Sequence, residues 1–131
     1  MTSTRRLTGR IRVPLPPVEA FRLFTPRGEQ DWAHGWDPRF PAPSPDDTQP
    51  GTVFETSAHG QHTIWLVTDR QPGKRISYAR VTPGDQAGTV TVSLSAAGLF
   101  GGDASCFSAR IWNRCVCSFS ACAGYCSRAC L

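Results

Sequence analysis

Polar and apolar residues alternate along several short stretches of the chain, which is the pattern of a β-strand with one buried face. In the stretch from Leu7 to Leu15, apolar or small residues hold the odd positions and the even positions are mostly polar. The same kind of pattern predicts four further strands and, less clearly, a sixth; they are Val53–Ala58, Thr63–Thr68, Arg75–Val81, Thr89–Ser95 and Ser105–Trp112.

Turn residues separate the strands after residue 53. Three short segments suit tight turns: His59-Gly60-Gln61, Gln71-Pro72-Gly73-Lys74 and Pro83-Gly84-Asp85-Gln86. Because glycine and proline favour the backbone angles of hairpin turns, this part of the chain is predicted to form an antiparallel meander.

The segment before the meander predicts one short helix followed by a loop. Apolar residues recur at three-residue steps in Pro17–Phe24, and the prolines at its start suit a helix entry. Residues 28–50 hold three aromatics among five prolines, so we expect an ordered loop with one helical turn at Glu29–Trp32. A sheet with one apolar face needs a cover, and this helix is too short to provide it. Either the C-terminal tail supplies a covering helix, or part of the apolar face stays uncovered, at residues such as Ile76, Tyr78, Val90, Val92 and Leu94.

Length and composition narrow the class of protein. A chain of 131 residues suits one domain, and 12 glycines with 11 prolines argue against a helical bundle. The net charge of +4 comes mostly from single, scattered residues, which argues against nucleic-acid binding. No apolar run approaches the ~20 residues of a membrane span, and the first residues do not resemble a signal peptide, so we expect a cytoplasmic protein.

All six cysteines lie in the last 26 residues, and residues 104–131 contain no Asp, Glu or Lys. Three readings are open: a disulfide framework, a zinc site, or reduced thiols without a role. The first lacks a signal peptide and the second lacks paired C-x2-C spacing, so incidental thiols are favoured. The cysteines are Cys106, Cys115, Cys117, Cys122, Cys126 and Cys130, and the last three would share one face of a helix at Ala121–Leu131.

Two segments resemble a known superfamily. Pro17–Glu29 and Trp32–Pro38, with its Trp-x3-Trp-Asp-Pro motif, are similar to the SRPBCC or START-like proteins, which include the Bet v 1 allergens and polyketide cyclase/dehydrase-like proteins. The resemblance covers about Leu7 to Gly101. It implies an α+β helix-grip fold, in which a curved antiparallel sheet with short N-terminal helices wraps around a long C-terminal helix and encloses a hydrophobic cavity.

The resemblance stops after residue 102. We expect an incomplete START-like domain at residues 7–102 and an atypical, poorly ordered, cysteine-rich tail at residues 103–131, with the grip helix missing or replaced. A reading-frame change or an error in the gene model would produce this abrupt change of composition. A truncated product without function is one alternative that it leaves open.

The resemblance implies binding of a hydrophobic small molecule, lipid or polyketide-like, without covalent chemistry, metal or cofactor. The residues expected to line the cavity are Trp32, Trp36, Phe54, Trp65 and Tyr78, although each could instead fill the core. A polyketide cyclase or dehydratase is an alternative, with His34 or Asp37 as general base. A protein resembling the Hsp90 ATPase activators is another. His59 and His62 flank a turn and are expected to be solvated, and no catalytic dyad or phosphate-binding loop is visible.

Overall fold

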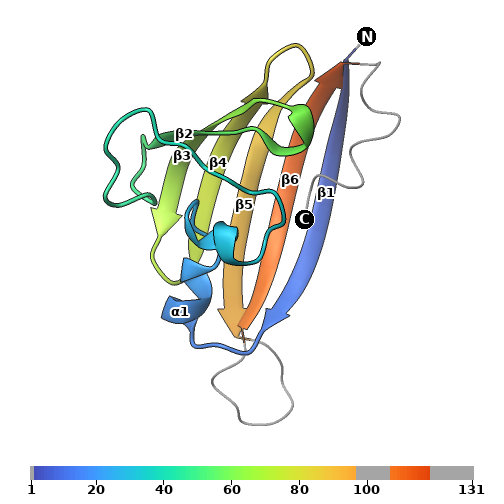
Figure 1. Cartoon of the computed structure of the whole chain (residues 1–131). Coiled ribbons are helices and arrows are strands. Elements are labelled where there is room, and N and C mark those ends of the chain that lie inside the picture. The colour runs from blue at the N-terminus through green and yellow to red at the C-terminus, as the bar shows by residue number, and fades with distance from the viewer. Residues whose placement is uncertain (1, 97–106, 119–131) are drawn as a thin grey trace.

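The computed structural model describes residues 2–96 and 107–118, whose six strands form one antiparallel sheet (Figure 1). The strand order is β1-β6-β5-β4-β3-β2. The strands are β1 (Thr2–Val13), β2 (Val53–Thr56), β3 (Thr63–Gln71), β4 (Arg75–Thr82), β5 (Gln86–Ala96) and β6 (Phe107–Ser118). The helices are α1 (Pro17–Arg22) and two 3-10 helices, η1 (Gly28–Asp31) and η2 (Ala58–Gly60). None of these helices is long and apolar enough to cross a membrane.

The predicted meander is confirmed, and two glycines close its turns. Gly73 and Gly84 have φ angles of 74° and 76°, in the left-handed region that glycine adopts without strain. They join β3 to β4 and β4 to β5, so that each strand pairs with its neighbour in sequence. The predicted turn at His59-Gly60-Gln61 instead contains η2, because one helical turn spans the gap between β2 and β3.

Strand β6, the last described element, lies between the first strand β1 and the meander strand β5. It pairs along its whole length with β1, from Val13 opposite Phe107 to Thr2 opposite Ser118, and on its other side with β5. The predicted sixth strand is therefore confirmed from Phe107 to Trp112 and continues to Ser118. Part of the segment expected to be a tail thus belongs to the same sheet. Cys115 and Cys117 lie in β6. The expectations for the other four cysteines and for the helix at residues 121–131 concern residues 97–106 and 119–131, which lie outside the described residues.

The core lies on one face of the sheet, which we call the inner face. In Figure 1, α1 and the segment after it lie in front of β4 and β5. The buried apolar side chains are Val13, Ala20, Phe21, Phe24, Phe54, Val67, Ile76, Tyr78 and Val92. The expectation of an uncovered face is thus wrong for Ile76, Tyr78 and Val92. Both α1 and the loop that follows it cover the sheet at these residues. Val90 and Leu94 are half-buried beside this core.

Candidate functional site

Four of the five aromatic residues expected to line a cavity lie together on the inner face. Phe54 of β2 stacks on Trp65 of β3 with ring centroids 5.8 Å apart and planes 4° apart. Trp36, from the loop after η1, meets Trp65 edge-on at 5.3 Å. Tyr78 of β4 presents its edge to Phe54 and Trp65 at 6.0 and 6.1 Å. We call Trp36, Phe54, Trp65 and Tyr78 the aromatic network.

Trp32 does not join the aromatic network. Its ring meets the ring of Phe24 edge-on at 5.8 Å, and 41% of the residue is exposed. Its indole N–H donates to the carbonyl oxygen of Leu23 at 2.7 Å. Trp32 therefore packs over the end of α1.

Hydrogen bonds fix the polar atoms of the aromatic network. The indole N–H of Trp36 donates to the Pro26 carbonyl oxygen at 2.7 Å, and that of Trp65 donates to Thr56 Oγ1 at 3.0 Å. The Tyr78 hydroxyl donates to the Phe24 carbonyl oxygen at 2.9 Å. Since two of these bonds join the loop to the network, the rings hold their orientation without a ligand.

The members of the aromatic network differ in how much surface they keep. Phe54 and Tyr78 are 1% and 4% exposed, so they are core residues. Trp36 and Trp65 are only half-buried. The part of the network within reach of a bound molecule is therefore the surface of these two tryptophans, and their role as cavity walls stays a prediction.

A buried arginine lies beside the network. Arg80 of β4 is 6% exposed, and its guanidinium carbon lies 5.7 Å from the ring centroid of Trp65. Its Nη2 also donates to Gln86 Oε1 at 3.3 Å. Arg80 was not among the predicted site residues, although its even position on β4, after Ile76 and Tyr78, places it on the buried face.

Glu29 of η1 is a second residue that the sequence analysis missed. It is half-buried, and its backbone is fixed at both ends: the N–H donates to the Thr25 carbonyl at 3.0 Å, and the carbonyl accepts from the Ala33 N–H at 2.8 Å. Gly28 is required before it, because a Cβ there would lie 1.6 Å from the Arg22 carbonyl oxygen. The signal available in the sequence was a carboxylate in the short stretch between Phe24 and Trp32.

Burial changes the protonation of this region. It raises the pKa of Glu29 from 4.5 to about 8, since water no longer stabilises the carboxylate. The pKa of Tyr78 is also raised, first by burial and then by the negative charges of Glu29 and Asp47. Around neutral pH the Glu29 carboxyl is therefore partly protonated and carries a proton that it could donate.

The histidine and aspartate candidates lie elsewhere. His34 and Asp37 are exposed. His62 lies 3.3 Å from a carboxylate oxygen of Glu55 and is largely solvated, as expected, whereas the side chain of His59 lies outside the described residues. In the part of the chain that the structure describes, no three His, Cys, Asp or Glu residues are grouped as metal ligands.

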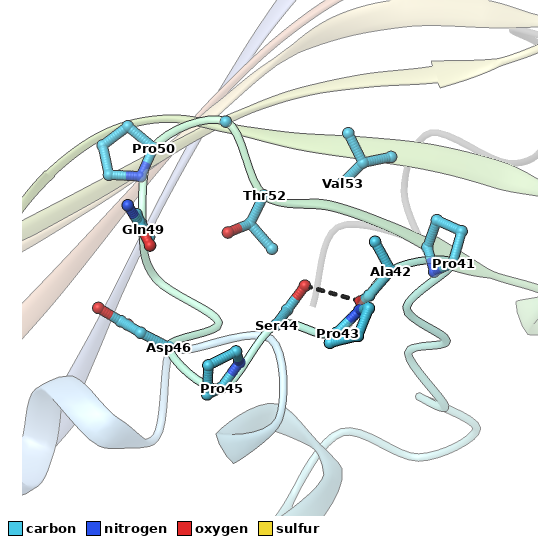
Figure 2. A pocket seen from close by; sticks show the side chains of 11 residues that line it. Pro41, Ala42, Pro43, Ser44, Pro45, Asp46, Gln49, Pro50, Thr52 and Val53 are labelled. Carbon is cyan, nitrogen blue, oxygen red and sulfur yellow. Dashed lines mark hydrogen bonds between the residues drawn. The ribbon is translucent and has the colours of Figure 1, made fainter.

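A surface pocket lies away from the predicted residues. Figure 2 shows it on the proline-rich loop, where the Ser44 hydroxyl donates to the Ala42 carbonyl oxygen at 3.0 Å. The pocket is lined by Pro41, Ala42, Pro43, Ser44, Pro45, Asp46, Gln49, Pro50, Gly51, Thr52 and Val53. Most of these residues are exposed, and Arg70 of β3 holds the loop through an ion pair with Asp46.

Comparison by sequence finds no matching family model and no matching curated protein. Solved structures do match. Protein MLL2253 from Mesorhizobium loti has a TM-score of 0.66 at 20% identity, over 83% of this chain and 75% of that one. CalU16 from Micromonospora echinospora has a TM-score of 0.60 at 17% identity, over 85% of this chain and 59% of that one. The chain has a helix-grip, Bet v 1-like fold.

The helix-grip fold is shared with other kinds of protein. An HSP90 activator from Plasmodium falciparum matches with a TM-score of 0.59 at 15% identity, over 82% of this chain and 71% of that one. The chain also spans only 59% of the length of CalU16. At these identities the likeness shows the helix-grip fold alone, so the ligand, the enzyme alternative and the Hsp90 alternative stay predictions.

Proposed function

We propose that this protein binds a hydrophobic small molecule, lipid or polyketide-like, against the inner face of the sheet, without covalent chemistry. The observation that supports the proposal is the aromatic network, in which the rings of Trp36 and Trp65 are held by hydrogen bonds yet keep accessible surface.

Apolar surface continues from the network across the sheet. Val90 and Leu94 of β5 and Ile11 of β1 are half-buried and pack at the margin of the core. A ligand lying along this surface would gain about 25 cal/mol for each Å² of apolar area removed from water. Because the tryptophan rings are already oriented, little ordering is needed on binding, which favours affinity.

Tryptophan fluorescence tests the proposal. We expect a fluorescent fatty acid or a polycyclic aromatic ketone to shift the emission of the purified chain in a saturable way. Trp65→Leu should weaken binding about tenfold, whereas the matched control Trp32→Leu should not, because Trp32 lies outside the network. If neither probe shifts the emission, the proposal is wrong; thermal melts of both variants exclude unfolding as the cause of a loss.

A second candidate function is acid–base chemistry on such a ligand, and Glu29 is the observation that favours it. Its half-buried carboxyl, with a pKa of about 8, suits proton transfer near neutral pH better than the exposed His34 or Asp37. Glu29→Gln should then abolish turnover of a polyketide-like ketone while leaving its binding intact, and Asp37→Asn should change neither. Turnover that survives Glu29→Gln would exclude this role.

A further inference from the structure

The outer face of the sheet, opposite the core, has a basic side. On β1 the odd-numbered Ile11 and Val13 pack in the core, whereas the even-numbered Arg6, Arg10 and Arg12 are exposed. On the neighbouring strand β6, the register partners of Arg6 and Arg10 are Arg114 and Arg110. No Asp or Glu occurs in β1, β5 or β6.

Within the described strands, no carboxylate compensates the positive charge of β1. Like charges directly opposite one another on neighbouring strands destabilise a sheet. The ion pairs found among the described residues join His62 to Glu55, Arg70 to Asp46 and Arg75 to Asp69, so none involves β1. The arginines of β1 are therefore available to an external anion.

The other side of the same outer face is apolar. Four aliphatic residues of β2, β3 and β4 are between 38% and 45% exposed: Val53, Ile64, Leu66 and Val81. The sheet register pairs Ile64 with Val81 and Val53 with Leu66, so that the four form one patch. The charged neighbour Glu55 is paired with His62.

Uncharged polar residues connect the two sides. Between the apolar patch and the arginines, Ser77 of β4 and Thr91 of β5 are joined by a side-chain hydrogen bond of 3.0 Å. The outer face thus changes from aliphatic to hydroxylated to basic across neighbouring strands, without an acidic residue on its basic half.

We propose that this outer face docks on an anionic lipid membrane, with the arginines on the lipid phosphates and the aliphatic patch at the boundary of headgroups and acyl chains. A bilayer surface offers both chemistries at adjacent depths, since a layer of phosphates covers an apolar layer. A nucleic acid would satisfy the arginines but would leave the aliphatic patch in water. The docking does not depend on the ligand proposed for the inner face.

Vesicle co-sedimentation tests this docking with the full chain. We expect binding to vesicles of phosphatidylcholine with about one-third phosphatidylglycerol, weakened by salt and much lower on phosphatidylcholine alone. Arg10→Thr with Arg12→Thr should weaken binding by about fivefold for each arginine removed. The matched control, Arg22→Thr with Lys74→Thr, removes the same charge from exposed positions outside this face and should leave binding unchanged.

Further variants separate the two halves of the surface. Threonine is chosen because it favours strands, so β1 is kept, and circular dichroism melts verify folding. Leu66→Thr should weaken vesicle binding without changing its dependence on salt, and inorganic phosphate at equal ionic strength should not displace the protein. The proposal is overturned if anionic vesicles are not bound, if both double variants lose equal affinity, or if a single-stranded oligonucleotide is bound more tightly through the same arginines.

Discussion

Replacing Glu29 by Gln should remove a pH dependence from the stability of the fold. Glutamine has nearly the shape of a protonated glutamate and cannot ionise. Because burial raises the pKa of Glu29 from 4.5 to about 8, the folded protein holds a proton that the unfolded chain releases between these two values. The wild-type free energy of unfolding should therefore fall as pH rises through this window, relative to that of the variant.

The expected size follows from the same values. At about 1.4 kcal/mol for each pKa unit, the difference sets an upper bound of about 5 kcal/mol. Glu29 is only half-buried, so solvent reduces the effect, and we expect about 2 kcal/mol. Below pH 4.5 both states carry the proton, and the two proteins should be equally stable within about 0.5 kcal/mol.

Urea unfolding of both proteins, at a series of pH values from 4 to 9, measures this difference. Glu19→Gln is the control, because Glu19 is an exposed carboxylate of the neighbouring α1 and should give curves parallel to wild type. If wild type and Glu29→Gln keep a constant difference across the whole range, Glu29 is not protonated in the fold and the reasoning is refuted.

Three other substitutions test separate contacts, each by chemical or thermal unfolding. Gly28→Ala should cost about 3 kcal/mol, because its Cβ would collide with backbone, whereas Gly9→Ala, with nothing within 4 Å, should be neutral or slightly stabilising. Tyr78→Phe should cost about 1–2 kcal/mol by leaving the buried carbonyl of Phe24 without its donor. Asp46→Asn should cost about 0.5 kcal/mol at neutral pH. Hydrogen bonds from Arg70 and then Thr48 lower the pKa of Asp46 below 3.8 in the folded protein. The cost of Asp46→Asn should therefore vanish as the pH falls below 3.8, and a cost that persists in acid would contradict this prediction.

The local part of the fold was predictable from the sequence. Alternation over Arg75–Val81 identified both the strand and its buried face, since Ile76 and Tyr78 lie in the core. Helix α1 starts at Pro17 as predicted but ends earlier, at Arg22, whose carbonyl accepts from the Thr25 hydroxyl at 2.9 Å. Such a cap is a local contact between a side chain and the backbone, which hydropathy does not encode.

The candidate site was only partly predictable for a related reason. Phe54, Trp65 and Tyr78 meet because they occupy one face of three adjacent strands, and a strand pattern contains that information. Glu29 lies in η1, where no strand pattern applies. Arg80 holds a buried-face position in the alternation of β4, but a charged residue in a hydropathy pattern usually indicates solvent exposure, so its burial was not predicted.

The pairing of β1 with β6 has a consequence for how the protein is made. Val13 and Phe107 lie opposite each other at the near end of this pair, more than ninety residues apart in sequence. At a synthesis rate of about 5–20 residues per second, β1 leaves the ribosome several seconds before β6, its partner strand in the described sheet, exists. During that interval a twelve-residue strand rich in arginine has no hydrogen-bonding neighbour, and the meander from β2 to β5 can form first. Closure of the sheet should then be the slow, late step of folding, and the nascent chain should be most exposed to chaperones and proteases until residues 107–118 have emerged.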